Sequence, residues 1–357
     1  NYRHHNASIS KLIQIIEEYI IIKEHLRGQK IKPSINLLLK MRDVGVKVSG
    51  LIMLFRISAH SDAEVSAEPA DYGRVNILSL IEAASERLAA RFSPVTGVTK
   101  SWNKKDGDDW SYPVIIDNMM NLELLEDASK LFSRPELDTI ARIHANTTMS
   151  NHFRSDYTCY HLLDYNPETG EVIKKQTVQG YADETCWSRG ESWALYGFAM
   201  MYRETGDEAY LAQAEKVAAY LFTVLPEDGI PYWDFNAPGT PSALPADASG
   251  CPDNYAWTEG DPVKRDASAA AVMASAFVEL SRLTKDAVKA EDYKAMAEKI
   301  LRTLSSDEYL ANPGENGCFL LKHSVGNFHA GKEVDVPLTY ADYYYLEALV
   351  KYANLQQ

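Results

Sequence analysis

A carboxyl set in an apolar run is the first residue of this sequence that could do chemistry. Asp117 follows three aliphatic residues and precedes, after Asn118, two methionines. A carboxyl in such surroundings loses hydration, which raises its pKa toward the range useful for a general acid. The start of a helix is also where an aspartate caps the chain and complements the helix dipole. The residues alone leave the catalytic and the capping interpretation about even.

An arginine between two tryptophans is the second candidate. Arg189 lies between Trp187 and Trp193 in a run of seven residues. Tryptophan faces can stack on a sugar ring, and a guanidinium can form paired hydrogen bonds with a carboxylate. Gly180 and Gly190 would permit tight backbone turns beside them. The alternative is that the tryptophans belong to the core and Arg189 to a structural ion pair. We favour a binding site.

Other patterns argue against several classes of chemistry. His144 and His161 are isolated, and a lone histidine is more often a core or surface group than a catalyst. No HExxH spacing occurs, so the sequence predicts no catalytic metal. GxGxxG, P-loop and GxSxG motifs are also absent, which argues against nucleotide cofactors and serine hydrolase chemistry. The four cysteines are widely spaced, which favours free thiols, or at most one or two bridges, over a metal site or a disulfide scaffold.

Composition and charge narrow the partners. The 357 residues are 46% hydrophobic, enough for a large core, and carry a formal net charge of -14. That charge repels nucleic acid and acidic membranes, so neither is expected as a partner, and an acidic substrate would need local positive groups. No apolar stretch of about 18 residues occurs, so no segment is expected to span a membrane. The sequence begins at Asn1, which suits a processed or trimmed chain.

Two kinds of helical segment alternate from about residue 72 onward. One kind is apolar nearly all round, as in buried helices: 114–131, 190–203, 265–283 and 340–352. The other kind is amphipathic: 76–92, 136–153, 207–222 and 291–304. A β-hairpin is expected at 158–165 and 171–175. Buried helices ringed by amphipathic ones predict an all-α fold, an α/α barrel of helical hairpins. An open α-solenoid is the alternative, because repeat spacing does not show closure.

The first 70 or so residues follow this pattern less clearly. Segments 9–26 and 35–41 have helical periodicity, and 51–57 is apolar. About ten helices can be counted in the whole chain, whereas six complete hairpins need twelve. We therefore expect a single catalytic domain over residues 1–357, with an atypical N-terminal part at 1–71 whose completeness is left open.

Residues 72–357 contain several long motifs that occur in the same order in one known family. The longest are 115–121, 164–170, 187–198 and 340–344, and the shorter ones are 101–102, 160–161, 179–181, 231–235, 265–269 and 335–338. In these motifs the chain resembles glycoside hydrolase family 88, the unsaturated glucuronyl hydrolases. The resemblance implies an (α/α)6 barrel.

The resemblance also implies vinyl-ether hydration in place of ordinary glycoside displacement. Polysaccharide lyases leave a sugar with a C4=C5 double bond at the non-reducing end of their products. In the family, an aspartate that matches Asp117 protonates C4 and then acts as the base while water adds at C5. The resulting hemiketal opens and the glycosidic bond is lost. One carboxyl that alternates between acid and base requires neither a metal nor an organic cofactor.

Substrate-contacting positions of the family fall on residues spread along this chain. They match Trp102, His161, Thr177, Gln179, Trp187, Arg189, Trp193 and, beside His323, Ser324. Trp102 matches a stacking position. The stretch 340–342 is expected to close the barrel and not to contact sugar.

The N-terminal region departs from the family at the second carboxylate. Family members carry another aspartate in a His-Asp-x-Gly-Phe motif that follows a Trp-Thr-x-Gly-Phe-Phe-Pro-Gly segment. The nearest match here is Asp43, with Arg42 and Val46 in place of the histidine and phenylalanine, and the Phe-Phe-Pro-Gly segment is absent. The sequence thus predicts Asp117 and Asp43 as the catalytic pair and leaves the completeness of the site open.

Three functions remain for comparison. The leading one is release of a 4,5-unsaturated uronic acid from lyase-generated glycosaminoglycan oligosaccharides. A second is an unsaturated galacturonyl or rhamnogalacturonyl hydrolase acting on pectin fragments, and a third is an impaired relative that binds sugar without turnover. The long matches at 187–193 and 340–349 favour the first. Relatives in Bacteroides-like bacteria are often exported, so the resemblance implies a periplasmic location, with a cytoplasmic one as the alternative.

Overall fold

Buried and partly exposed helices take turns along the chain. The computed structural model describes residues 77–104, 107–244, 249, 258–312 and 315–355. The helices buried on most sides are α5 (Asn118–Phe132), α7 (Ser188–Thr205), α9 (Ala267–Leu283) and α11 (Thr339–Ala353). Those that alternate with them are α4 (Ile77–Ala89), α6 (Pro135–Asn151), α8 (Glu208–Val224) and α10 (Ala287–Leu304). The predicted alternation is confirmed. The expected segments 9–26, 35–41 and 51–57 lie outside the described residues.

Small residues allow the buried helices to approach one another closely. Every residue of α9 from Ala267 to Leu280 is buried, and more than half of them are alanine or serine. Gly197 of α7 lies so near α5 that a Cβ there would be 2.5 Å from Met119 Cβ. The outer helix α8, in contrast, buries a single stripe at helical spacing that includes Tyr210, Ala214 and Val217. Burial thus separates an inner set of helices from an outer set.

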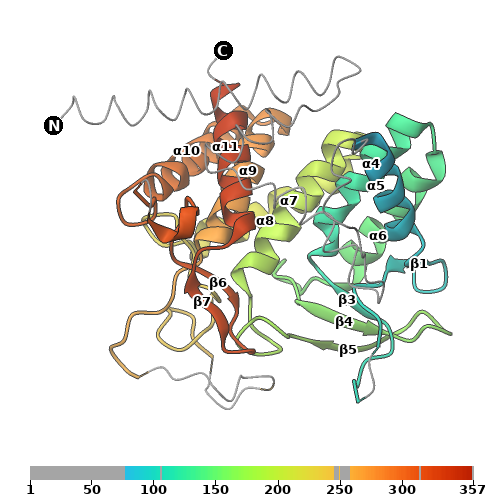
Figure 1. Cartoon of the computed structure of the whole chain (residues 1–357), viewed down its shortest axis with the longest axis horizontal. Coiled ribbons are helices and arrows are strands. Elements are labelled where there is room, and N and C mark those ends of the chain that lie inside the picture. The colour runs from blue at the N-terminus through green and yellow to red at the C-terminus, as the bar shows by residue number, and fades with distance from the viewer. Residues whose placement is uncertain (1–76, 105–106, 245–248, 250–257, 313–314, 356–357) are drawn as a thin grey trace, which may run out of the picture.

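The inner helices lie side by side, and outer helices pack against α5, α7 and α9. α9 packs against both α7 and α11, and α7 also packs against α5. α6, α8 and α10 pack against α5, α7 and α9, respectively, as the second helices of hairpins (Figure 1). Helical hairpins arranged around an inner layer form an α/α barrel, which is the predicted fold class.

Short strands complete the fold. β3 (Pro113–Ile115), β4 (Leu162–Tyr165) and β5 (Val172–Gln176) form one antiparallel sheet. β1 (Phe92–Ser93) pairs with β2 (Val98–Thr99), and β6 (Ser324–Asn327) pairs with β7 (Lys332–Val336). The predicted hairpin is confirmed as β4 and β5. The predicted start of a helix at residue 114 is wrong, because residues 113–115 pair with β4 and α5 begins only at Asn118.

The strands mark the side of the molecule on which the inner helices begin. β3 leads directly into α5, and β7 leads into α11. β6 packs against α9, and residue 187, which precedes α7, forms an isolated bridge with residue 234. In Figure 1 the strands gather below the helices, on the side where α5, α7, α9 and α11 start. The N-terminal ends of the inner helices therefore share one side of the fold.

Candidate active site

Polar and aromatic side chains converge at these N-terminal helix ends. Asp117, Trp187 and Asp266 occupy the cap positions of α5, α7 and α9, and Tyr340 lies in the first turn of α11. Arg189 forms an ion pair with Asp266 at 2.9 Å, and its Cζ lies 5.3 Å from the centre of the Tyr340 ring. Free N–H groups at helix N-termini carry partial positive charge and favour anions. This end of the fold is the candidate active site.

The Asp117 carboxyl does not cap its helix. The residue has helical dihedrals (φ -54°, ψ -27°), and its side chain forms no hydrogen bond to the first turn of α5. Oδ2 is buried without a hydrogen-bond partner among the described residues, while 20% of the side chain stays exposed. Asp117 therefore lies at the cap position, as the capping interpretation expects, but makes no capping hydrogen bond; its effect on the helix dipole stays a prediction. An unpartnered carboxyl oxygen in a buried site is available to a ligand or to a proton.

Burial raises the pKa of Asp117 to about 6. Loss of hydration is the largest cause, because it disfavours the charged carboxylate. The positive charge of Arg189 opposes this shift, and the indole N–H of Trp193 does so too, although Trp193 Nε1 does not meet the geometry of a full hydrogen bond. A carboxyl with a pKa near 6 can both give and accept a proton near neutral pH.

His161 brings a ring nitrogen close to Asp117. Its Nδ1 accepts hydrogen bonds from the backbone N–H groups of Val178 (3.1 Å) and Gln179 (3.2 Å), so the ring proton must reside on Nε2 in the neutral form. Nε2 lies 3.9 Å from Asp117 Oδ2 and has no hydrogen-bond partner in the part of the chain that the structure describes. Burial and the charge of Arg189 hold the pKa of His161 well below its usual value. A neutral imidazole therefore offers one free donor to the site.

The loop after β5 supplies the groups that hold His161. Thr177 Oγ1 lies 3.4 Å from His161 Nδ1 and accepts the N–H of Gly180 at 2.8 Å. A Cβ on Gly180 would come within 2.9 Å of both Thr177 Oγ1 and Trp187 Cβ, so close packing explains this glycine. Gly190, in contrast, lies inside α7 and forms no turn, which corrects the expectation from sequence.

Arg189 is fully engaged by protein acceptors at its two terminal nitrogens. Nη1 donates to Asp266 and to the backbone carbonyl of Val325, and Nη2 donates to Gln179 Oε1 (2.9 Å) and to the carbonyl of Gly326 (2.7 Å). The structural ion pair that sequence left as an alternative is therefore present. The charge of Arg189 also lowers the pKa of Asp117. Contact between Arg189 and a substrate carboxylate stays a prediction.

Both tryptophans are buried against other site residues, each with 2% exposure. The Trp187 ring lies 4.5 Å from the His161 ring, and Arg189 Cζ lies 4.5 Å from the Trp187 centroid. Trp193 packs edge-on against Tyr344, with the ring centres 5.2 Å apart. Their burial agrees with the interpretation that the two tryptophans belong to the core. Trp187 also lies beside Arg189, and Trp193 lies beside Asp117, so both line the candidate site.

Trp102, Ser324 and Asp43 complete the set of predicted site residues. Trp102 is partly exposed and stacks edge-on with Trp110, while the neighbouring Ser101 accepts the Ile115 N–H at 2.8 Å and so ties that segment to the approach to α5. Ser324 is fully buried, and its hydroxyl has no hydrogen-bond partner within the described ranges. Asp43 lies outside the described residues.

Sequence reasoning missed two contributors to the site. Asp266 is fully buried and neutralises Arg189, whereas the sequence motif at 265–269 indicates no role for it. A buried arginine needs such an acidic partner, which is the signal that could have found it. Tyr340 was expected only to close the barrel, yet its ring lies over Arg189. Asp342 does hold structure as expected, because it accepts the N–H groups of Leu320 and Leu321.

The isolated histidine His144 is a core residue. Its Nδ1 accepts the Thr99 N–H at 2.9 Å, and burial lowers its pKa to about 3. Cys159 and Cys186 are free, buried thiols, as expected. Within the described residues, no cluster of histidine, cysteine, aspartate and glutamate side chains is arranged to hold a metal ion. No helix there is both long and apolar enough to cross a membrane.

Several known proteins are similar to this chain. An unsaturated glucuronyl hydrolase of Formosa agariphila is 41% identical over 278 residues, which cover 77% of this chain and 63% of that protein. An unsaturated chondroitin disaccharide hydrolase of Streptococcus agalactiae is 31% identical over 281 residues, with 78% and 65% covered. The crystal structure of an unsaturated glucuronyl hydrolase specific for heparin is 45% identical, with a TM-score of 0.68 over 77% of this chain and 68% of that one.

The match covers a different share of each relative's length. No family model matches the sequence, and the chain spans less than two thirds of the length of the two curated relatives. The solved structure, however, is matched over 68% of its length at 45% identity and in the same helical fold. On that similarity the chain belongs to the unsaturated glucuronyl hydrolases, glycoside hydrolase family 88.

Proposed function

We propose that this protein releases a 4,5-unsaturated uronic acid from the non-reducing end of lyase-generated glycosaminoglycan oligosaccharides by hydrating the C4=C5 double bond. The observation that carries the proposal is the Asp117 carboxyl, which is buried, forms no helix cap and has its pKa raised to about 6. Family membership supplies the substrate class, and the raised pKa supplies a group that can work as acid and as base.

The reaction needs one proton to be donated and one to be returned. Asp117 in its protonated form gives its proton to C4, and the positive charge develops at C5 and the ring oxygen. Water adds at C5 and transfers a proton to the Asp117 carboxylate, which restores the acid. The resulting hemiketal opens to a ketone, and the hemiacetal left at C1 loses the rest of the oligosaccharide. His161 Nε2–H lies 3.9 Å from Asp117 Oδ2, too far for a hydrogen bond, and has no partner among the described residues, so we expect it to donate to the bound substrate.

The charge of the site suits an acidic sugar in an acidic protein. The net charge of -14 repels a uronate at long range. Arg189 and the N-termini of the inner helices provide the local positive potential that binding requires. Part of the Arg189 charge is neutralised by Asp266, so we expect the helix ends to contribute to binding of the substrate carboxylate. A periplasmic location, to be checked by cell fractionation, stays a prediction.

Loss of the ultraviolet absorbance of the conjugated uronate tests the proposal directly. The relative that is named as specific for heparin makes heparin disaccharides the first substrates to assay, followed by chondroitin and hyaluronan disaccharides. Decay with any of these supports the proposal. Decay with an unsaturated pectin fragment alone would move the function to galacturonyl hydrolysis. Binding in calorimetry without decay for any substrate would indicate a sugar-binding relative without turnover.

The pH dependence of kcat/KM follows from the pKa of Asp117. Because the protonated carboxyl is the form that donates to C4, activity should be highest below about pH 6. It should fall about tenfold per pH unit as Asp117 ionises above that value. Trp193→Phe removes an N–H that lowers the pKa of Asp117. The kcat/KM of this variant should therefore start to fall at a higher pH than that of the parent. A profile that is flat between about pH 5 and pH 8 would contradict the assignment.

A further inference from the structure

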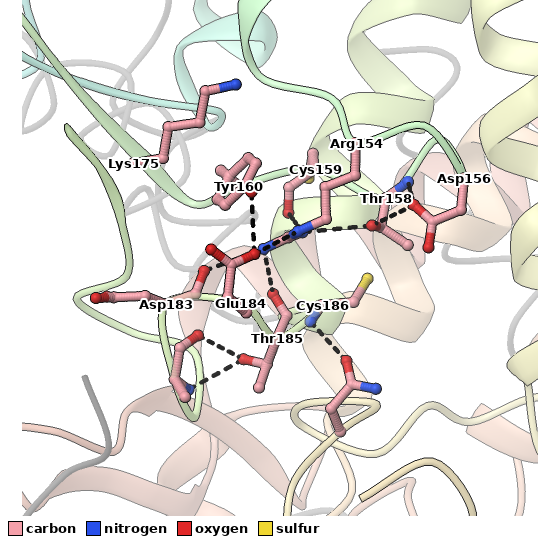
Figure 2. A network of polar contacts seen from close by, with 12 residues as sticks. Arg154, Asp156, Thr158, Cys159, Tyr160, Lys175, Asp183, Glu184, Thr185 and Cys186 are labelled. Carbon is pink, nitrogen blue, oxygen red and sulfur yellow. Dashed lines mark hydrogen bonds and ion pairs between the residues drawn. The ribbon is translucent and has the colours of Figure 1, made fainter. Parts of the chain in front are cut away.

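Arg154 forms a clamp between two segments beside the active site. It follows the end of α6, and its side chain is 15% exposed. Figure 2 shows the guanidinium reaching between the segment from Thr158 to Tyr160 and the segment from Asp183 to Cys186. Neither the family resemblance nor the sequence patterns assigned it a role. Its surroundings indicate that it holds the site in shape.

All five N–H donors of Arg154 have acceptors. Nη1 donates to Thr158 Oγ1 (3.3 Å) and to the carbonyl of Cys159 (3.1 Å). Nη2 donates to the carbonyls of Asp183 (3.0 Å) and Thr185 (3.4 Å), and Nε donates to Glu184 Oε2 (3.3 Å). Only arginine offers five donors in a planar fork, so lysine could keep at most three of these bonds.

One clamped segment leads to His161 itself, and the other contacts the turn that supplies the hydrogen-bond donors to His161. His161 itself lies two residues after Cys159. On the other side, Asp183 Oδ1 accepts the N–H of Thr177 at 2.8 Å, and this fixes the start of the turn that continues through Val178 and Gln179. The N–H groups of those two residues are the donors to His161 Nδ1. Arg154 thus joins the segment that carries the imidazole to the segment that fixes its proton on Nε2.

A stack of charged and aromatic groups stiffens the clamp. Arg154 Cζ lies 3.7 Å from the centre of the Tyr160 ring, and Lys175 Nζ lies 4.9 Å from the same centre. The Tyr160 hydroxyl donates to Glu184 Oε2 at 3.0 Å, the oxygen that also accepts from Arg154. These contacts leave the guanidinium little freedom to rotate away from its carbonyl acceptors.

We propose that Arg154 is a positioning residue that holds His161 in the neutral Nε2–H form, with Nε2 kept 3.9 Å from Asp117 Oδ2. Arg154 acts through the backbone of residues 158–161 and 177–185. The catalytic consequence rests on the proposed function, since it requires that Asp117 carry out proton transfer. The effect on the imidazole does not, because it concerns the free protein.

Nitrogen NMR of histidine-labelled protein tests the proposal without substrate. In the unaltered protein, His161 should give the shifts of an unprotonated Nδ1 and a protonated Nε2, unchanged between about pH 5.5 and pH 8. The His161 signal is assigned by its loss in His161→Gln. In Arg154→Gln, loss of the backbone donors to Nδ1 should mix the two tautomers and bring a protonation step into that range. Arg154→Lys should fall between the two.

Kinetics supply the second measurement. Arg154→Gln should lower kcat about 10- to 100-fold, with KM changed less than about threefold, because misplacement of a catalytic group affects turnover more than binding. The matched control is Arg203→Lys. Arg203 also binds several acceptors, including Glu123 of α5 and Glu279 of α9, but lies at the other end of α7. It should lose stability and leave the His161 shifts and kcat unchanged.

The outcomes separate a positioning role from a purely structural one. If Arg154→Gln keeps the Nε2–H signal and a kcat within twofold of the control, the proposal is overturned. If Arg154→Gln does not fold, Arg154→Lys and Glu184→Gln carry the same test, since each removes only part of the clamp. If no variant or parent turns over any substrate, the proposed function fails, and the NMR result still decides the role of Arg154.

Discussion

Asp117→Asn should lower kcat about 10⁴-fold and leave disaccharide binding within a few-fold of the parent. An amide neither donates a proton to carbon nor accepts one from water, and a single group that serves in both steps reaches the upper end of the usual acid–base contribution. Binding should persist because the substitution keeps the size of the side chain. Stopped assays of the conjugated uronate give kcat, and calorimetry gives the binding constant.

The same substitution should stabilise the fold above pH 6. The pKa of Asp117 is raised in the folded protein, from 3.8 to about 6, so the folded state binds its proton more tightly than the unfolded state does. Stability is therefore lost as the pH rises through that interval, and the charged form stays unfavourable at neutral pH. A shift of about two pKa units corresponds to at most on the order of 3 kcal/mol, and solvent at the exposed fifth of the side chain reduces what a neutral amide recovers.

Asp286 provides the control for this prediction. It also occupies a helix cap position, that of α10, but its carboxylate accepts the N–H groups of Val288 and Lys289. Asparagine caps about as well as aspartate, so Asp286→Asn should change neither kcat nor stability appreciably. If Asp117→Asn keeps a near-normal rate, the acid–base assignment fails. If it is destabilised at pH 8, the argument from burial fails.

Arg189→Met should destabilise the protein by about 3–5 kcal/mol. The substitution leaves the Asp266 carboxylate without its cationic partner in a fully buried position, and it frees the carbonyls of Val325 and Gly326 as well. Breaking one partner of a buried ion pair costs this much because the other charge stays unpaired. Urea unfolding near neutral pH measures the loss.

Arg265→Met is the matched control for Arg189. Arg265 binds Asp228 at 2.8 Å, but the two side chains are 26% and 39% exposed, so solvent screens the pair. Its loss should cost about 1 kcal/mol or less. Adding Asp266→Asn to Arg189→Met should recover part of the larger loss, which a double-mutant cycle measures. Equal losses for Arg189 and Arg265 would show that the buried pair has no special weight.

The fold was predictable because its signal is local. Apolar and amphipathic segments differ in which faces are buried. The spacing of apolar residues within one helix, over about four turns, is enough to show this difference. The helix start at residue 114 failed because strand pairing with residues 162–164 decides the conformation of 113–115. A partner that distant leaves no trace in the local periodicity.

The residues of the candidate site could be named from the sequence, but their arrangement could not. Asp117 could be named, but whether it caps α5 depends on the direction of its side chain, which no pattern of neighbours states. Arg189 could be named, but its partner Asp266 lies 77 residues further along the chain. The proton position on His161 depends on the backbone of Val178 and Gln179, whose side chains carry no information about it.

The contacts of Arg189 couple the site to the completion of folding. Its acceptors come from segments 77 and 136 residues away, so α7, α9 and the β6 strand must all be in place before the charge is neutralised. A partly assembled chain would hold either a bare guanidinium or a bare carboxylate in an apolar interior, and both are costly. Turnover should therefore require the completely folded chain. Under denaturant, activity should disappear over the same concentration range as the cooperative unfolding of the protein.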